Sequence, residues 1–409
     1  MLTVKDLPDL SGQRVIVRVD FNVPIKEGMI RDDNRIVAAL PTIKELINKH
    51  ARVILMSHLG KIKHKLQEED PEKFAKQLKD GNMAPVAVRL SELLIKVVTF
   101  VPTTRGKELD DAVAALEDGD VLLVQNTRYE KGEEKNDPDL SKYWASLGDA
   151  FVMDAFGSAH RAHASTYGIP EVLKANGKPV AVGYLVEKEV QNLSRCVTVD
   201  KKDRPYVAIL GGLKVSDKIK VIDSLLGKCD KILIGGAMAF TFLKALGHTT
   251  GTSPVEDDQL EYAKNCFLKS NGRIILPVDS IVADSFDPEE RTVIQAVDSD
   301  SISKELQGLD IGAETRKIFA NEIAKAKMIF WNGPMGVFEQ SEFQKGTLAI
   351  CDAIAKNTEA FTVCGGGDSA AAIKQFGYKD KFSHVSTGGG ASLEMIENDG
   401  HLPGIDVIR

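Results

Sequence analysis

The stretch that decides the fold lies between residues 14 and 58, where RVIVRVD (Arg14–Asp20) and RVILMSH (Arg52–His58) flank AALPTIKELINK (Ala38–Lys49). The two outer segments are short and rich in β-branched residues, which is typical of buried strands. The middle segment has helical spacing, and Pro41 indicates an early turn of that helix. A strand, a helix and a second strand in succession predict a βαβ unit with parallel strands.

The same alternation continues along the whole chain. Further strand-like runs are Val121–Asn126, Ala150–Asp154, Tyr206–Gly212, Lys231–Gly236, Arg273–Asp279, Met328–Asn332, Phe361–Gly365 and His384–Thr387. Helix-forming stretches separate them, so we expect an α/β fold with mostly parallel sheets covered on both faces. Ligands of such sheets bind beyond the carboxyl ends of the strands, which is where candidate site residues are sought. The charged run Lys61–Asp80 reads as a solvated surface insertion.

Length and composition narrow the class of protein. A chain of 409 residues exceeds what a single core usually supports, so two domains are expected. The net charge of −7 disfavours a general nucleic-acid binder but leaves small anionic substrates open. Five scattered cysteines without a C-x-x-C pair argue against a zinc site and a disulfide framework. With no signal peptide and no long apolar run, a cytoplasmic protein that does not span a membrane is predicted.

Strand ends in the first half carry charged or hydrogen-bonding side chains. They are Asp20, Asn22, His58, Lys61, Asn126, Arg128, His160, Arg161 and His163, with Arg35 in a loop before a helix. Guanidinium groups match the oxygens of phosphate and carboxylate, so several at one sheet edge predict a site for a small polyanion. For any single arginine a surface ion pair is the better explanation, and His163 is equally explained by a hydrogen bond within its loop.

Strand ends in the second half carry glycine instead. The turns are Gly211-Gly212, Gly235-Gly236, Gly333, Gly365–Gly367 and Gly388–Gly390. Glycine lets main-chain N–H groups approach a ligand, and a following helix N-terminus favours anions, so these turns predict a nucleotide site. Tight packing of strand on helix explains any one turn equally well. Neither a P-loop nor a dinucleotide-binding motif is present.

Charged residues beside these turns offer phosphate and metal contacts. Lys214 and Lys218 are four residues apart, so one helix face is expected to present both ammonium groups. Asp368, at a glycine-rich helix start, is a candidate Mg²⁺ ligand, with an ordinary helix cap as the alternative.

Several longer motifs together resemble one known family. They are RVDFNVP (Arg18–Pro24), SHLGK (Ser57–Lys61), FGSAHRAHAS (Phe156–Ser165), GGLKVSDKI (Gly211–Ile219), WNGPMGVFE (Trp331–Glu339), GGGDS (Gly365–Ser369) and STGGGA (Ser386–Ala391). In this order the motifs resemble the phosphoglycerate kinase family over residues 18–391. The resemblance implies two doubly wound, Rossmann-like domains: 1–185 for phosphoglycerate, a hinge helix at 186–195, 196–387 for the nucleotide, and 388–409 returning to the first domain.

The resemblance also implies roles for single residues. The implied phosphoglycerate contacts are Asp20, Phe21, Asn22, Arg35, His58, Leu59, Gly60, Lys61, Arg128 and Arg161. The implied nucleotide contacts are Lys214, Lys218, Glu339, Gly366, Gly367, Asp368 and Ser369. Arg35 and Lys214 are the implied catalytic residues, and Asp368 is the implied ligand of Mg²⁺, which accompanies ADP or ATP. A monomer and a homodimer both remain open.

The chain departs from the family pattern at three places. Lys61 stands where the family usually has arginine and is followed by Ile62 rather than proline, so a bidentate fork is lost. Leu213 replaces alanine and narrows the expected base pocket, whereas Ser369 replaces threonine and keeps the hydroxyl group.

The implied reaction is reversible phosphoryl transfer between 1,3-bisphosphoglycerate and ADP, giving 3-phosphoglycerate and ATP. Two other functions stay open: a kinase for a different phosphorylated acid, and a silent metabolite-sensing protein on the same fold. Assays with alternative phosphoryl acceptors would distinguish a kinase for a different acid. A silent sensing protein is disfavoured because the chain keeps Arg35, Lys214, Lys218 and Asp368.

Overall fold

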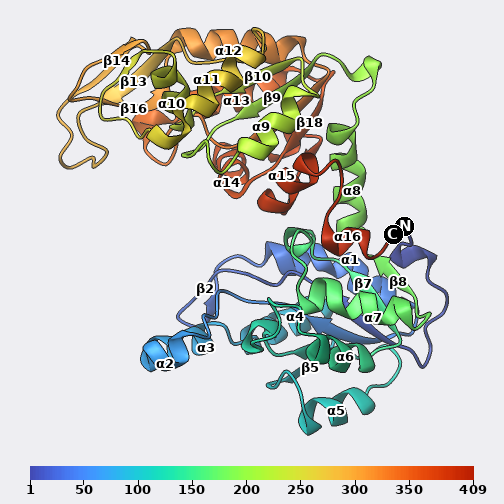
Figure 1. Ribbon diagram of the computed structural model, residues 1–409. Coiled ribbons are helices and arrows are strands. Elements are labelled where there is room, and N and C mark those ends of the chain that lie inside the picture. The colour runs from blue at the N-terminus through green and yellow to red at the C-terminus, as the bar shows by residue number, and fades with distance from the viewer. The chain divides into compact units, whose positions relative to one another are not determined.

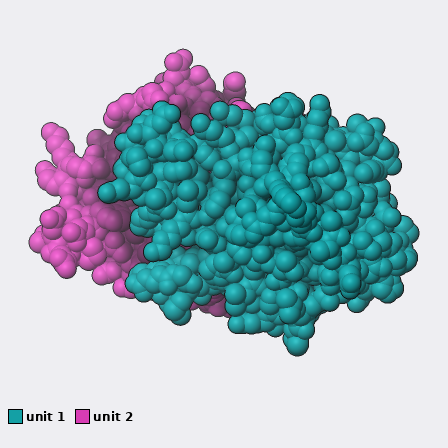
Figure 2. Space-filling model, turned by 90° about the horizontal axis from the view of Figure 1, so that it is seen from below, with its two compact units in different colours: residues 1–191, 401–409 teal, residues 192–400 magenta.

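The computed structural model describes residues 1–409, and the chain forms two compact units (Figures 1 and 2). Unit 1 comprises residues 1–191 and 401–409, and unit 2 comprises residues 192–400. The change of unit falls inside helix α8 (Tyr184–Val197), which contains the stretch expected to act as a hinge. The return to unit 1 begins at residue 401 rather than 388, because α15 (Gly389–Glu397) packs on α9 (Ile219–Leu226) within unit 2.

Unit 1 is built on a six-stranded sheet in the order β5-β6-β4-β1-β7-β8. The strands are β1 (Arg14–Arg18), β4 (Arg52–Met56), β5 (Val98–Val101), β6 (Val121–Val124), β7 (Ala150–Met153) and β8 (Val180–Val182). All neighbouring pairs are parallel, and the chain winds outward from β1 in both directions, which is the doubly wound arrangement. The edge strands β5 and β8 were not predicted.

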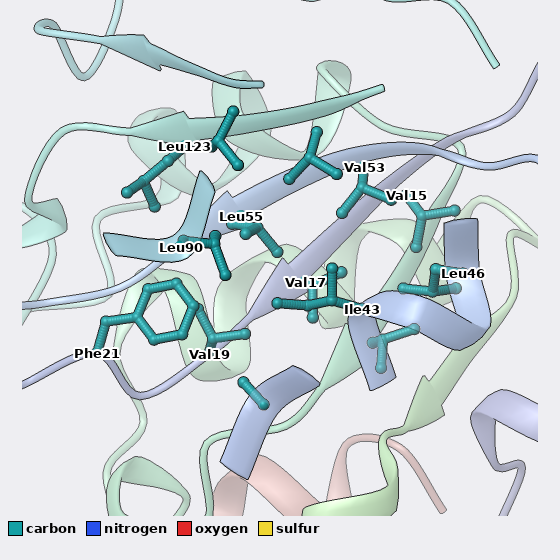
Figure 3. Packing of buried hydrophobic residues seen from close by; sticks show 14 of the residues in the cluster. Val15, Val17, Val19, Phe21, Ile43, Leu46, Val53, Leu55, Leu90 and Leu123 are labelled. Atoms are coloured by element: carbon teal, nitrogen blue, oxygen red, sulfur yellow. The ribbon is translucent and has the colours of Figure 1, made fainter. Parts of the chain in front are cut away.

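Helices cover both faces of this sheet. They are α1 (Asn34–Asn48), α2 (Leu66–Glu69), α3 (Pro71–Asp80), α4 (Ala84–Leu94), α5 (Lys107–Ala114), α6 (Pro138–Ser146), α7 (Ile169–Ala175), the start of α8, and α16 (Pro403–Asp406). Alternate strand residues such as Val15 and Val17 pack with Ile43 of α1 and Leu90 of α4 in one cluster (Figure 3). The cluster fixes one face of the sheet.

Helix α1 begins earlier than its apolar pattern predicted. Pro41 lies inside the helix rather than in its first turn, since the helix starts at Asn34. The buried face that includes Ile36, Ile43 and Leu46 outweighs the hydrogen bond that a proline removes from a helix. The earlier start places Arg35 in the first turn, next to the carboxyl end of β1.

Unit 2 has a second six-stranded parallel sheet, in the order β12-β10-β9-β17-β18-β19. The strands are β9 (Tyr206–Leu210), β10 (Lys231–Ile234), β12 (Ile274–Ile275), β17 (Met328–Asn332), β18 (Phe361–Cys364) and β19 (His384–Val385). The helices are α9, α10 (Met238–Ala245), α11 (Leu260–Lys269), α12 (Ala313–Lys325), α13 (Lys345–Lys356), α14 (Gly367–Phe376) and α15.

The expected strand Arg273–Asp279 is divided between two sheets. Its start forms β12 of the parallel sheet, and its last residue begins β13 (Asp279–Ala283) of an antiparallel sheet. That sheet has the order β14-β13-β16, with β14 (Ile294–Asp298) and β16 (Gln307–Ile311). Two-stranded ribbons pair β2 (Ile25–Lys26) with β3 (Met29–Ile30) and β11 (Thr249–Thr250) with β15 (Ser301–Ile302).

Among the helices, none has both the length and the apolar character that a bilayer crossing requires. In each unit the parallel strands bring their carboxyl ends to one edge of the sheet, and the residues expected to carry function follow those ends.

Candidate functional site

The first candidate region lies at the carboxyl edge of the unit 1 sheet. Strands β1 and β4 are in parallel register, with Arg18 opposite Met56, so the residues after them meet. The main-chain N–H of Phe21 donates to Ser57 Oγ at 2.9 Å, and that of Gly60 donates to Asn22 Oδ1 at 2.8 Å. The structure therefore brings together the segments around Asp20 and His58.

Arg35 reaches this edge from the first turn of α1. Its Nη1 lies 3.0 Å from both carboxylate oxygens of Asp20. The Arg35 side chain is still 43% exposed, so part of its guanidinium group faces solvent. The pair brings a cation to the carboxyl end of β1 without burying it.

Arg128, after β6, is held against the same edge. Its Nη1 donates to the carbonyl of Gly60 at 2.8 Å, and its main-chain N–H donates to Asn126 Oδ1 at 3.0 Å. Asn126 is fully buried and also bonds both main-chain groups of Leu59. Asn126 thus fixes the loop after β4, while Arg128 carries the charge.

The remaining expected residues of unit 1 divide into exposed and buried groups. Lys61 and Arg161 are exposed, which leaves both cations available to a solute. The side chains of Phe21 and Leu59 are buried in the core, and their main-chain N–H groups bond to Ser57 and Asn126. The structure therefore leaves these two with no free N–H donor or exposed side chain at the edge.

The loop after β7 carries two histidines beside Arg161. His163 is buried as the cap of a short helical turn, and its main-chain N–H donates to Thr166 Oγ1 at 3.0 Å. Burial and the nearby charge of Arg161 lower the pKa of His160 to about 4. The C-terminal segment packs on this loop, since Gly404 N–H donates to the carbonyl of Ala159 at 2.8 Å.

His58 is buried and contacts a residue that sequence reasoning did not select. Arg18, the last residue of β1, is 1% exposed, and its Nη2 lies 2.9 Å from His58 Nδ1. Burial, and then the charges of Arg18, Arg128 and Arg35, hold the pKa of His58 well below its usual value. A charged residue inside an apolar strand is the signal that selects Arg18. Ser165 and Glu133, which bond further along this network, give no such signal.

The second candidate region lies at the carboxyl edge of the unit 2 sheet. The predicted helix face shared by Lys214 and Lys218 does not exist, because residues 211–218 form turns and α9 begins at Ile219. Lys214 is exposed, whereas Lys218 is buried and its Nζ donates to the carbonyls of Gly211 and Asn332. Burial lowers the pKa of Lys218 to about 8, against the opposing charges of Asp217 and Asp368.

The glycines at this edge occupy two different kinds of surroundings, one closely packed and one open. A Cβ on Gly333, whose φ is +97°, would lie 2.2 Å from the carbonyl oxygen of Gly211, so tight packing of neighbouring loops requires glycine there. Gly367 has open space around it and begins α14. Ser369 Oγ is buried and accepts from the N–H of Gly333 at 2.7 Å, so its hydroxyl ties the two loops together.

A cavity of about 300 Å³ opens beside these turns within unit 2. Its walls are mostly apolar and include Leu213, Ala237, Phe240, Leu309 and Val337. Glu339 and Asp368 supply carboxylates on its lining. A mostly apolar cavity with a few polar groups is typical of a small-molecule site.

Asp368 is the candidate metal ligand. Its side chain is exposed in the first turn of α14, within electrostatic range of Lys218. No group of three or more His, Cys, Asp or Glu side chains is arranged to hold a metal ion. Mg²⁺ typically takes one or two carboxylates together with phosphate oxygens and water, so a single exposed carboxylate fits it when phosphate and water supply the remaining ligands.

Known proteins resemble this chain over nearly its whole length. The family model described as "Phosphoglycerate kinase" matches residues 4–399. The phosphoglycerate kinase of Enterococcus faecalis is 54% identical over 411 residues, covering 100% of this chain and 98% of the relative. That of Fusobacterium nucleatum is 55% identical over 404 residues, covering 98% and 97%.

Solved structures give the same result. The phosphoglycerate kinase from Coxiella burnetii superposes with a TM-score of 0.85 at 39% identity, covering 100% of this chain and 98% of the other. That from Pyrococcus horikoshii gives a TM-score of 0.82 at 32% identity, with the same coverage. With a matching family model, close relatives and matching structures that span essentially the whole chain, this protein belongs to the phosphoglycerate kinase family.

Proposed function

We propose that unit 1 binds phosphoglycerate and unit 2 binds Mg-ADP or Mg-ATP in the phosphoglycerate kinase reaction. That reaction transfers a phosphoryl group reversibly between 1,3-bisphosphoglycerate and ADP, and it belongs to glycolysis. The chemistry of the two edges supports this division. Exposed cations, among them Arg35, gather at the unit 1 edge, whereas unit 2 has a mostly apolar cavity lined by three acidic residues, Asp310, Glu339 and Asp368.

In unit 1, Arg128, Arg161 and Lys61 would bind the phosphate of the three-carbon acid, because guanidinium and ammonium groups donate to phosphate oxygens. Asp20 and Asn22 would orient its hydroxyl group, and His58 would donate to an oxygen of the acid. Gly60 leaves room for the ligand, with a φ of +65° and open space at its Cα. Phe21 and Leu59 would contribute only through the loops they anchor.

In unit 2, the cavity would hold the nucleoside, with Leu213 on its wall and Glu339 at the ribose. Lys218 and the N-terminal turn of α14 at Gly366, Gly367 and Ser369 would face the phosphates. Asp368 would hold Mg²⁺, which neutralises phosphate charge during transfer. Lys214, exposed on the preceding turn, would contact the phosphoryl group in transit.

No general base is needed for this chemistry. In the direction that consumes ATP the nucleophile is a carboxylate, which is ionised at neutral pH because an ordinary carboxyl pKa is about 4. Its oxygen forms a bond to the γ-phosphorus as the bond to the β-phosphate oxygen of ADP breaks. Arg35 and Lys214 would stabilise the charge on the group in transit, and positioning supplies the rest.

The two groups of residues belong to different units, so both substrates must be brought together for transfer. We propose closure about α8 when both ligands are bound, which also excludes water from the phosphoryl group. Small-angle scattering tests this directly. A radius of gyration unchanged by both substrates together would contradict closure.

A coupled assay with 3-phosphoglycerate and Mg-ATP tests the function itself. Substituting Lys214→Ala should abolish transfer while 3-phosphoglycerate still binds with near-normal affinity, since Lys214 belongs to unit 2. Near-normal turnover in that variant would remove Lys214 from the mechanism. Activity with a different phosphorylated acid, and none with 3-phosphoglycerate, would overturn the substrate assignment.

A further inference from the structure

The guanidinium group of Arg18 lies inside unit 1 rather than at its surface. Its Nε donates to Ser165 Oγ at 2.8 Å, its Nη1 donates to the carbonyl of Val19, and its Nη2 faces His58 Nδ1 at 2.9 Å. With 1% of its surface exposed and all three nitrogens engaged by protein groups, Arg18 has no route to a substrate. Its function is therefore exerted through the residues it touches.

In the hydrogen bond between Arg18 and His58, only Arg18 can be the donor. Arginine carries five N–H donors and no acceptor, and it keeps its proton in proteins. His58 Nδ1 must therefore accept, which places the ring proton on Nε2. No hydrogen bond joins His58 Nε2 to another protein group. We propose that Arg18 is a positioning residue that fixes His58 as the neutral Nε2–H tautomer, so that Nε2 donates to an anionic oxygen of the substrate.

The surroundings of His58 keep the ring neutral. Burial disfavours a charged ring most, and Arg18 from β1, Arg128 after β6, Arg35 from α1 and His163 after β7 act in the same direction. The carboxylates of this region, Asp20 and Glu133, are bound by Arg35 and by Ser165. The donor on Nε2 is thus present at neutral pH without any protonation step.

The buried charge of Arg18 is balanced along a hydrogen-bonded chain. Ser165 Oγ accepts from Arg18 and donates to Glu133 Oε2 at 2.7 Å, and Ser165 N–H donates to Glu133 Oε1 at 2.8 Å. Glu133 is 1% exposed. An unbalanced buried cation would be costly, so Glu133 supplies the opposite charge that lets Arg18 stay beside His58.

The tautomer is measured in the ligand-free wild-type protein by long-range ¹H–¹⁵N correlation spectra of ¹⁵N-histidine. His58→Gln identifies the signal. We expect the Nε2–H pattern, unchanged between pH 6 and pH 8. His50 is the internal control, because its Nδ1 lies 2.8 Å from a carboxylate oxygen of Asp9 and must donate rather than accept. A protonated Nδ1 on His58, in either the neutral or the charged ring, overturns the proposal.

A charge-balanced pair of substitutions, Arg18→Met with Glu133→Gln, tests the positioning. His58 should then populate both tautomers and titrate nearer the ordinary histidine pKa of about 6.5. We expect kcat/KM for 3-phosphoglycerate to fall roughly tenfold at pH 8, since an oriented hydrogen bond to a charged group is lost. The ratio of variant to wild-type KM should change with pH between 6 and 8. An unaltered tautomer in the folded variant contradicts a role for Arg18.

That the group accepting the hydrogen bond from His58 Nε2 belongs to 3-phosphoglycerate rests on the proposed function. A separate experiment tests this part. If His58→Gln leaves the KM for 3-phosphoglycerate unchanged, the substrate role of His58 fails. The tautomer spectra of the ligand-free protein are independent of that outcome, so the two failures can be told apart.

Discussion

Arg35 presents one guanidinium nitrogen to both carboxylate oxygens of Asp20, each at 3.0 Å. The pair links the first turn of α1 to the residues that follow β1, and the arginine remains partly exposed. An exposed ion pair of this kind contributes little to stability. Its significance therefore lies in where it holds the cation, at the sheet edge where the phosphoryl acceptor would bind.

Replacing Arg35 with lysine should show whether the reaction needs only its positive charge or also the planar arrangement of its N–H donors. Arg35→Lys keeps the positive charge but loses the planar fork, so an incoming phosphoryl group is bound through fewer, less oriented donors. We expect kcat to fall about 10²–10³-fold, by analogy with the loss of an oxyanion donor. The dissociation constant of 3-phosphoglycerate, measured by calorimetry, should change much less.

A matched control lies at the opposite edge of the same sheet. Arg52, at the start of β4, donates from Nε to Asp118 Oδ1 at 3.0 Å and is similarly exposed. Arg52→Lys should leave kcat at the wild-type value. Equal losses in both variants would mean that any exposed arginine pair supports the reaction, and Arg35 would lose its proposed role.

Nucleotide affinity should depend on the protonation of Lys218. Burial lowers the pKa of Lys218 to about 8, so its ammonium group loses its proton as the pH rises past that value. The phosphates then lose a charged donor, and ADP should bind about tenfold more weakly at pH 9.5 than at pH 7. Calorimetric titrations at several pH values measure the effect.

Two variants of neighbouring lysines check the assignment. Lys218→Met should bind ADP weakly with little dependence on pH in this range. Lys220→Met, in the exposed first turn of α9, should keep the wild-type profile. A wild-type affinity that stays constant from pH 7 to pH 9.5 would show that the Lys218 ammonium does not contact the phosphates.

Substitution of Lys61 should increase the affinity for 3-phosphoglycerate rather than decrease it. It is exposed after Gly60, while Ile62 beside it is buried and fixes the direction of the loop. Lys61→Arg restores a bidentate fork to an otherwise unchanged loop, so the KM for 3-phosphoglycerate should fall a few-fold with kcat unchanged. Lys65→Arg, exposed in the same segment, is the control. An unaltered KM would place Lys61 outside the substrate site.

Local pattern predicted the central parallel strands and the glycine turns, because buried strands and left-handed turns are encoded by neighbouring residues. It was wrong where tertiary contacts decide the outcome. The spacing of Lys214 and Lys218 indicated one helix face, but the carbonyls of Gly211 and Asn332 hold Lys218 in a turn. Glu133 lies in a charged run that reads as surface and is buried because Ser165, distant in sequence, bonds to it.

Asp154 gives a prediction about stability. It follows β7, is 1% exposed, and its Oδ1 accepts from the N–H of Leu185 in the first turn of α8 at 3.1 Å. Its Oδ2 has no hydrogen-bond partner. Burial raises the pKa of Asp154 to about 7, although the hydrogen bonds from Thr42, Val186 and Leu185 act in the opposite direction.

The sign of the pH dependence follows from this shift. In the unfolded chain an aspartate has a pKa of about 3.9, so between pH 4 and pH 7 the folded state keeps a proton that the unfolded state has lost. Folding is then favoured less as the pH rises through that window. Asp154→Asn cannot ionise, so its stability relative to wild type should increase with pH, by at most about 1.4 kcal/mol per pH unit.

Urea unfolding of wild type and variant from pH 4.5 to pH 7.5 measures this difference. Asp118→Asn is the contrasting control, because the N–H of Gly12 and the Arg52 side chain lower the pKa of that exposed carboxylate. A group with a lowered pKa stabilises the folded state above its unfolded pKa, and its contribution is lost as the pH falls. Between pH 4.5 and pH 7.5 the Asp118→Asn difference curve should therefore stay nearly flat, whereas the Asp154→Asn curve should rise with pH. Parallel curves would mean that Asp154 stays ionised in the folded protein, despite its burial between the end of β7 and the first turn of α8.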